Sequence, residues 1–425
     1  MFIDRTCTYI ITLKIKIKKM KKFNIYRIAF LLMLGMLPML ANAQIAVKAE
    51  TIYTMEGAAI SNGVILIRDG KIQQVGTAAQ VNIPAGYEVH EAKVVTPGLV
   101  DGHSVVGLAG ILNAPGDQDQ LERSSPIQPD LRAIDAYNAR EALVGYVRSQ
   151  GVTTMHTGHG TGAIISGQTM VVKTVGENIE EVTLVPEKML AMTLGTMTTS
   201  NFSSPGTRAK VIAMLRTELL KAQSYLKKME DSDPAKHPAR DLKMEALAKL
   251  LKGETKALIT ANTASDIQAA LRLKEEFGFK LVLDGAAEAY NFIEEIKASG
   301  AEVTIHPTMA RSSGDMQNMN METAGKLAQA GIPVSLQSGF EAYVPKARVI
   351  RFEAAEAVKF GMDYNEALKS ITINPAKILG LEARVGSIKA GKDADLVLYD
   401  GDPFEYLTNV CIVMINGKVV ESQCN

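Results

Sequence analysis

Short apolar runs rich in β-branched residues alternate with amphipathic stretches through most of the chain. Eight runs have the length and composition of strands, and stretches with helical periodicity separate them. These runs are Val94–Val100, Val152–His156, Met170–Lys173, Met189–Leu194, Ala257–Thr260, Leu281–Asp284, Glu302–His306 and Pro333–Gln337. The repeated order of strand and helix predicts an α/β fold, a (β/α)8 TIM-like barrel, with a doubly wound sheet as the alternative.

The two ends of the predicted barrel are flanked by segments with a different, β-rich pattern. Asp69-Gly70 and Asn416-Gly417 each stand between two β-branched runs, which is the signature of a hairpin. Chain ends of a domain tend to lie close together, so both segments are expected in one small composite β-sandwich domain. The predicted boundaries are 44–96 and 381–425 for this β-domain, and 97–380 for the barrel.

Residues 1–43 have the pattern of a leader that contains a signal peptide. Met20 is followed by basic residues, the apolar run Ile28–Leu40 and the small residues Ala41 and Ala43. The apolar run is shorter than the roughly 20 residues that span a bilayer. The pattern predicts translation from Met20, cleavage near Ala43, and a periplasmic or secreted protein with no membrane anchor after signal removal.

Charge and cysteine content narrow the classes of partner. The chain has 46 basic and 46 acidic residues, but residues 1–43 carry +7, so the remainder carries −7. A mildly acidic body does not favour binding to nucleic acid. In the predicted hairpin register Cys411 faces Ser422, which leaves Cys424 diagonal to it. A disulfide and two free thiols are therefore both open.

Four segments carry recognisable motifs in a fixed order. They are Val95-Thr-Pro-Gly-Leu-Val-Asp-Gly-His-Ser-Val105, Gly151-Val-Thr-Thr154, Asn374-Pro-Ala-Lys-Ile-Leu-Gly380 and Val385-Gly-Ser-Ile-Lys-Ala-Gly-Lys-Asp-Ala-Asp-Leu-Val-Leu398. Together the motifs resemble the amidohydrolase superfamily, especially imidazolonepropionase-like members, over essentially all of residues 45–421. The resemblance implies a metal-dependent hydrolase of C–N bonds, built from a barrel and a composite β-domain.

The metal ligands that this resemblance implies are mostly missing. The family holds one or two divalent metals through a His-x-His pair, a carboxylated Lys, two further His and an Asp. Only the first His remains, as His103, and Val105 stands at the second position. The other four positions fall on Ala191 (with Lys188 nearby), Thr260, Gly285 and Gly339. The usual binuclear centre is therefore predicted absent, with at most one divalent metal such as zinc in a reduced site.

Four of the six histidines end predicted barrel strands or follow them closely, on the face where barrel enzymes work. His103, His156, His159 and His306 are the candidate metal ligands. The candidate catalytic residues are His103, His156, His306 and Asp101. Asp101 lies two residues before His103, so alternation along a strand predicts that it orients the His103 ring. Asp284 and Glu341 are further candidates for a remodelled site. For each histidine alone, a structural hydrogen-bonding role is the simpler interpretation.

These observations predict an exported amidohydrolase-like hydrolase. Its substrate is expected to be a small molecule with a non-peptide or cyclic amide C–N bond. The alternative is a catalytically inactive homologue that acts as a ligand-binding or partner subunit, since a barrel alone does not imply chemistry. A homo-oligomer and pairing with a homologous amidohydrolase are both open.

Overall fold

The computed structural model describes residues 44–112, 114–340 and 347–424. The predicted leader, residues 1–43, and the candidate Glu341 lie outside these described residues. Within them, no helix is long and apolar enough to cross a membrane.

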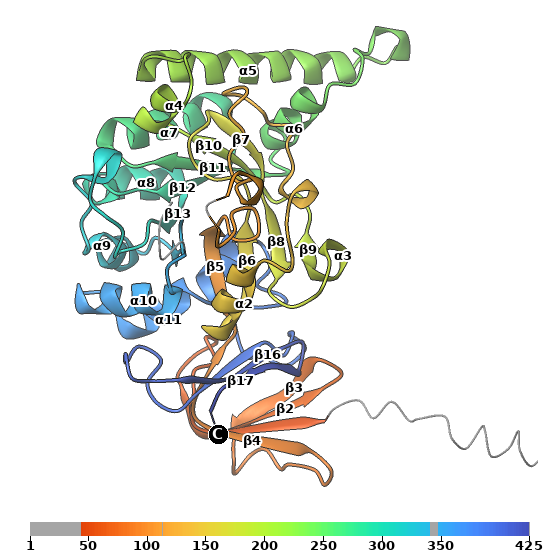
Figure 1. Cartoon of the computed structure of the whole chain (residues 1–425), viewed down its shortest axis with the longest axis vertical. Helices are drawn as coiled ribbons and strands as arrows, with labels where there is room; N and C mark the ends of the chain where they lie inside the picture. Colours follow the sequence, from red (N-terminus) through yellow and green to blue (C-terminus); the bar gives the residue numbers. More distant parts are fainter. Residues whose placement is uncertain (1–43, 113, 341–346, 425) are drawn as a thin grey trace, which may run out of the picture. The chain divides into compact units, whose positions relative to one another are not determined.

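One seven-stranded sheet is built from both ends of the described chain (Figure 1). Its order is β17-β16-β15-β4-β1-β2-β3, and β15 pairs antiparallel with β4. The Asp69-Gly70 and Asn416-Gly417 turns have positive φ at both positions, as two-residue hairpin turns require. The strands are β1 (Ile45–Ile52), β2 (Ile60–Arg68), β3 (Lys71–Thr77), β4 (Glu88–Pro97), β15 (Leu396–Tyr399), β16 (Val410–Ile415) and β17 (Lys418–Ser422).

The barrel strands form two ladders, β5-β6-β8-β9 and β7-β10-β11-β12-β13-β14. The ladders meet where Thr169 separates β7 from β8 and where Ser104 bridges to Gly339 beyond β14. Every predicted barrel strand contributes to them. The strands are β5 (Leu99–Ser104), β6 (Val152–Thr157), β7 (Ile165–Gln168), β8 (Met170–Lys173), β9 (Thr183–Val185), β10 (Met189–Thr193), β11 (Lys256–Ala261), β12 (Leu281–Gly285), β13 (Glu302–Ile305) and β14 (Val334–Leu336).

Two details of the strand prediction are wrong. The predicted strand 94–100 is divided, because β4 ends at Pro97 in the seven-stranded sheet and β5 begins at Leu99 in the barrel. The third predicted barrel strand, Met170–Lys173 (β8), runs antiparallel to β6 rather than parallel, and β7 just before it runs antiparallel to β10. A glycine-rich loop, not a helix, connects β6 to β7, so the chain turns straight back as an antiparallel neighbour.

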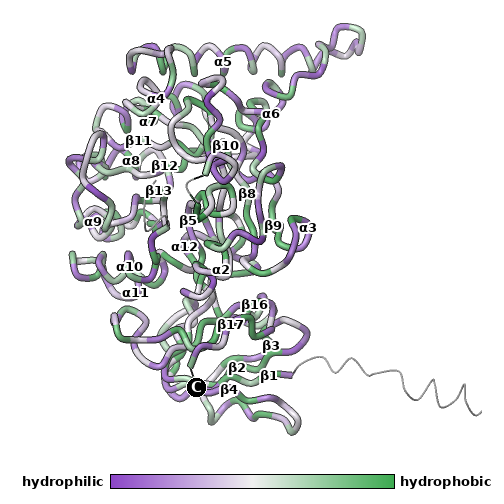
Figure 2. The backbone as a smooth tube through the Cα atoms, in the orientation of Figure 1, coloured by the Kyte–Doolittle hydropathy of each residue, from purple (hydrophilic) through white to green (hydrophobic). Residues whose placement is uncertain are grey.

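Helices cover the barrel strands, and their caps agree with the sequence. Thr263 accepts a hydrogen bond from the backbone N–H of Asp266 at the start of α7, and Gly278 ends that helix at φ 73°. The long α5 buries one stripe, and Figure 2 shows hydrophilic and hydrophobic residues alternating along it. The helices are α2 (Ala142–Ser149), α3 (Ile179–Val182), α4 (Thr196–Asn201), α5 (Arg208–Met229), α6 (Leu242–Leu251), α7 (Ala264–Phe277), α8 (Ile293–Ser299), α9 (Thr323–Gln329), α10 (Ile350–Lys359), α11 (Tyr364–Ser370) and α12 (Ile373–Ile378).

A buried ion cluster joins the barrel to the seven-stranded sheet. Lys173, the last residue of β8, contacts the carboxylates of Asp395 and, at 3.3 Å, Asp393. Asp393 also accepts from Lys71 at 2.5 Å and from Arg384 at 3.1 Å. Both aspartates belong to the 385–398 motif, so that motif serves to attach the sheet to the end of the barrel where β8 finishes. We call these five residues, Lys71, Lys173, Arg384, Asp393 and Asp395, the floor cluster.

The structure decides between the two alternatives for the cysteines, because Cys411 and Cys424 form a disulfide with Cα atoms 4.7 Å apart. The predicted register, with Cys411 opposite Ser422, is wrong by one residue. A register shift between Val413 and Met414 places Ile412 opposite Ser422. This irregularity brings Cys424 nearer to Cys411 than a regular hairpin does.

Candidate active site

The candidate site is built around a hydrogen bond between the ends of two barrel strands. His103 lies near the end of β5 and Asp284 near the end of β12. The Nδ1 atom of His103 is 3.0 Å from Oδ1 of Asp284, although the two residues are 181 positions apart in the chain. His103 is 5% exposed and Asp284 is 2% exposed, so the pair is shielded from water.

Two further strand ends hold the Asp284 carboxylate. The Thr260 hydroxyl, from β11, donates to Oδ2 at 2.6 Å. The Gln337 side-chain amide, just beyond β14, donates to Oδ1 at 2.9 Å. Both residues were missed as functional candidates in the sequence, although each ends a predicted strand. Together with His103, they give the carboxylate three donors from three strands. We call His103, Thr260, Asp284 and Gln337 the mouth cluster.

The electrostatics of the pair reinforce the hydrogen bond. Burial opposes ionisation of Asp284, but the attraction of His103 and the three hydrogen bonds outweigh it and lower the carboxyl pKa below its ordinary value. Burial also opposes protonation of His103. The neighbouring Asp284 charge and hydrogen bond prevail, and the imidazole pKa is raised above its ordinary 6.5. The carboxylate therefore stays ionised and accepts the Nδ1 proton, so the lone pair of neutral His103 lies on Nε2.

His156 lies beside this pair but is fully hydrogen-bonded. Its ring centre is 5.6 Å from that of His103. Its Nδ1 donates to the carbonyl of Gly102 at 2.8 Å, and its Nε2 is 2.7 Å from the Thr169 hydroxyl. Burial, with the nearby His103 charge, lowers the pKa of His156 to about 3. His156 is therefore a neutral residue that positions the backbone beside His103.

The other two candidate histidines are placed differently. The Nδ1 of His306 donates to the carbonyl of Pro307 at 2.6 Å, and its Nε2 is buried without a partner. His159 has no hydrogen bond to either ring nitrogen, and burial lowers its pKa to about 4. A Cβ built at Gly167 would lie 2.4 Å from the His159 ring, so the ring packs against the backbone of β7. The structure thus brings the His156 ring beside the His103 pair, whereas His159 adjoins His103 only through its backbone, which helps to raise the His103 pKa.

Asp101 does not orient the His103 ring, which corrects the prediction from strand alternation. Its Oδ1 accepts from the backbone N–H groups of Ser338, at 3.0 Å, and of His103, at 3.3 Å. The register between β5 and β6 is irregular from Asp101 to Ser104, so the simple alternation fails there. Burial raises the Asp101 pKa to about 6. Asp101 joins β5 to the end of β14, and Asp284 takes the orienting role.

Comparison with known proteins identifies the family. Residues 94–420 match the amidohydrolase family. The chain belongs to the amidohydrolase family. It is 27% identical over 378 residues to amidohydrolase tasK of Hapsidospora irregularis, a match covering 80% of this chain and 38% of that protein. It is 24% identical over 399 residues to the imidazolonepropionase of Shewanella sp. strain MR-4, covering 85% of this chain and 94% of that protein.

A solved structure agrees with this assignment. The amidohydrolase from Thermotoga maritima MSB8 has a TM-score of 0.83 and 29% identity, covering 89% of this chain and all of that one. Molinate hydrolase, at a TM-score of 0.58 and 16% identity, shares the fold. Together these neighbours establish the α/β TIM-like barrel with its accompanying β-domain.

Amidohydrolases generally use divalent metals, but the described residues of this member do not fit such a centre. The buried Nε2 atoms of His103 and His306 lack partners, as a ligand nitrogen would before it binds a metal. A catalytic zinc needs three protein ligands, however. Among the described residues, the only group of three candidate ligands with atoms within 4.8 Å of one another is Asp400, Cys411 and Cys424. Because that pair of cysteines is a disulfide, the group offers no thiolate.

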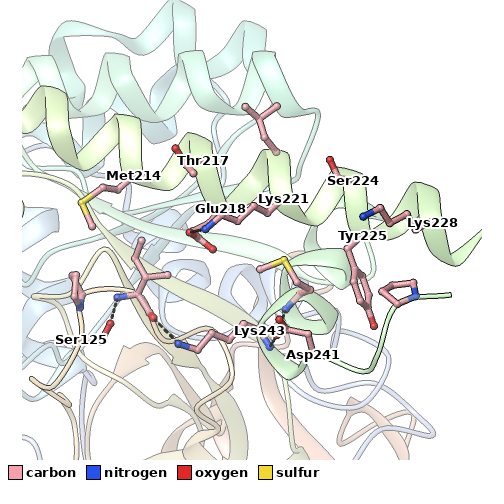
Figure 3. A pocket seen from close by; sticks show the side chains of 15 residues that line it. Ser125, Met214, Thr217, Glu218, Lys221, Ser224, Tyr225, Lys228, Asp241 and Lys243 are labelled. Carbon is pink, nitrogen blue, oxygen red and sulfur yellow. Dashed lines mark hydrogen bonds and ion pairs between the residues drawn. The ribbon is translucent and has the colours of Figure 1, made fainter. Parts of the chain in front are cut away.

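Two hollows lie away from the mouth cluster. Figure 3 shows one of about 980 Å³ between α5 and α6, where Lys221 and Glu218 form a 2.7 Å ion pair. The other, of about 1500 Å³, lies between the loop at 53–59 and helices α11 and α12. Neither hollow is lined by any of the candidate histidines, so the chemistry of the family is better sought at the mouth cluster.

Proposed function

We propose that this amidohydrolase is an exported hydrolase that cleaves a non-peptide or cyclic amide C–N bond in a small molecule. The observation that carries the proposal is the buried hydrogen bond from His103 to Asp284. A histidine held in one tautomer by a carboxylate can act as a general base and acid through its other nitrogen. Family membership supplies the class of bond, and the relatives named imidazolonepropionase supply the preference for a cyclic amide.

The reaction requires one proton to move through His103. Its Nε2 takes a proton from water while the water oxygen bonds to the carbonyl carbon. The tetrahedral carbon then releases the nitrogen, which receives the same proton from Nε2 as the C–N bond breaks. Asp284 stays ionised throughout and stabilises the imidazolium form between these two steps. The raised pKa of His103 keeps that form accessible near neutral pH.

One buried hydroxyl is available to stabilise the carbonyl oxygen. Thr304 pairs with Asp284 in the β12–β13 ladder, and its side-chain oxygen has no hydrogen-bond partner. Hydroxyl donors aimed at a developing oxyanion lower the barrier to acyl transfer. Because the Nε2 of His103 is closed off from solvent, substrate entry is expected to need movement of the loops at the barrel mouth.

Two observations support export. The pattern of residues 20–43 is that of a signal peptide, and the Cys411–Cys424 disulfide suits an oxidising compartment. N-terminal sequencing of the protein from a periplasmic fraction tests this part, with Gln44 as the expected first residue. A first residue at or near Met20 would contradict cleavage. Assembly as a homo-oligomer or with a homologous amidohydrolase stays a prediction.

The activity is tested with purified mature protein and a panel of lactams, N-acyl amino acids and dipeptides. Wild type is compared with Asp284→Asn, which keeps the shape of the side chain but removes its charge. We expect kcat/KM to fall by roughly 10²–10⁴-fold, because the Nδ1 proton of His103 loses its ionised acceptor. Asp233→Asn, in an exposed turn far from the barrel strands in sequence, is the matched control and should leave the rate unchanged.

Two outcomes would contradict the proposal. Hydrolysis that survives Asp284→Asn at the wild-type rate would remove the pair from the chemistry. No hydrolysis anywhere on the panel, together with a ligand-induced rise in melting temperature, would favour the alternative of an inactive ligand-binding homologue.

A further inference from the structure

Two of the lost ligand positions are occupied by glycines whose backbone excludes a ligand side chain. Gly285 has φ 75°, and a Cβ there would lie 2.5 Å from Oδ1 of Asn262. Gly339 has φ 62°, and a Cβ there would lie 2.8 Å from the ring of Pro307. L-residues rarely adopt such φ values. At the ends of β12 and β14, therefore, the backbone disfavours a side chain such as His or Asp.

A third lost position now supports a carboxylate instead of a metal. By the resemblance to the family, Thr260 falls on the position of the fifth-strand histidine, and its hydroxyl donates to Asp284 at 2.6 Å. Asp284 lies directly before Gly285, the position of the sixth-strand histidine. The residues at and beside two former ligand positions thus bond to each other.

The donors around Asp284 leave it poorly placed to bind a cation. Three of its roughly four lone-pair directions accept hydrogen bonds, from His103, Gln337 and Thr260. A metal at this carboxylate would have to break one or more of these buried bonds. The Nδ1 of His103 is directed to the same carboxylate, which leaves one imidazole nitrogen of that residue for any other partner.

We propose that the imidazole–carboxylate pair of His103 and Asp284 replaces the divalent metal of the family, and that this barrel mouth functions without one. Thr260 and Gln337 are the positioning residues that hold the carboxylate in place. The inference rests on the proposed function and deepens it, because it states that no metal takes part in activating water there. The statement that no metal binds through His103 can be tested whether or not a substrate is found.

Metal content and histidine NMR test the inference directly. Wild type and His103→Gln are purified from the same export host, and their zinc, manganese, cobalt and iron contents are measured by mass spectrometry. With ¹⁵N-labelled histidine the six rings of the full chain give few signals, and the one absent from His103→Gln belongs to His103. We expect no metal that depends on His103, and an Nδ1–H tautomer whose Nε2 signal is unchanged by added Zn²⁺.

Variants of the supporting residues test the positioning roles. Asp284→Asn should shift the His103 ring signals most, and Thr260→Val should shift them less, because one of three donors to the carboxylate is lost. Thr255→Val is the matched control, since its hydroxyl donates to the carbonyl of Lys188 just before β11 begins. It should leave the His103 signals unchanged.

The outcomes separate this inference from the proposed function. One equivalent of metal that is lost in His103→Gln, or a Zn²⁺-dependent shift of the His103 Nε2 signal, overturns the inference whether or not hydrolysis occurs. Metal that persists in His103→Gln is bound at another site, and this outcome is consistent with the inference. A chain that binds no metal through His103 and hydrolyses no compound contradicts the proposed function alone.

Discussion

The mouth cluster and the floor cluster are both built around buried aspartates, but they differ in how completely their polar atoms are paired. In the floor cluster, each oxygen of Asp393 and Asp395 has a hydrogen-bond or ion-pair partner. At the barrel mouth, the Nε2 atoms of His103 and His306 are buried without hydrogen-bond partners. Buried polar atoms are nearly always satisfied in a native protein, so the unpartnered atoms support the mouth as the candidate active site, whereas the fully paired floor cluster stabilises the fold.

The floor cluster should respond most strongly to loss of a charge. Lys173→Met leaves the buried carboxylate of Asp395 without its cation, and we expect the free energy of unfolding to fall by about 3–5 kcal/mol. Lys71→Met removes a cation from the same cluster, but the Lys71 side chain is 45% exposed, so the loss should stay below about 1 kcal/mol. Urea unfolding of both variants measures the difference. Equal losses would mean that burial does not set the strength of this cluster.

The barrel should respond to acid through the buried ring of His159. The folded-state pKa of about 4 lies below the ordinary 6.5, so between these values the unfolded chain binds a proton that the folded chain does not. The free energy of unfolding therefore decreases as pH falls through this window, by up to about 3 kcal/mol. In His159→Leu this decrease should be absent. Urea unfolding at about pH 4.5 and about pH 7.5 measures it, and the higher pH reports packing alone. Reduced activity of His159→Leu at pH 7.5 would show instead that His159 contributes to the active site.

The smallest effect is expected at the edge of the seven-stranded sheet. The disulfide closes a short loop, with 13 residues of separation, so the Cys411→Ser and Cys424→Ser double variant should lose about 2 kcal/mol. Unfolding of the double variant should match that of the reduced wild type, and the mouth chemistry should be unaffected. A change in the His103 signals would show that the two regions are coupled.

The sequence predicted the strands better than it predicted their directions. Eight barrel strands and both hairpin turns could be identified, because periodicity and turn chemistry are local properties. The antiparallel segment at Met170–Lys173 was missed, because its direction depends on which neighbour it pairs with. The position of Cys424 was missed for a similar reason, since a bulge changes register without any marked signal in the sequence.

His103 shows the same division at the candidate site. The sequence by itself determined that His103 lies at the end of a strand and that the chain has the motifs of an amidohydrolase. It also showed that Val105 stands at the second position of the His-x-His pair. Only the tertiary structure decided that Asp284 and not Asp101 orients the ring, and that Thr260 and Gln337 hold that carboxylate. The reason is that a hydrogen bond across 181 residues depends on barrel closure and on an irregular register in β5. Neither is encoded in the residues next to His103.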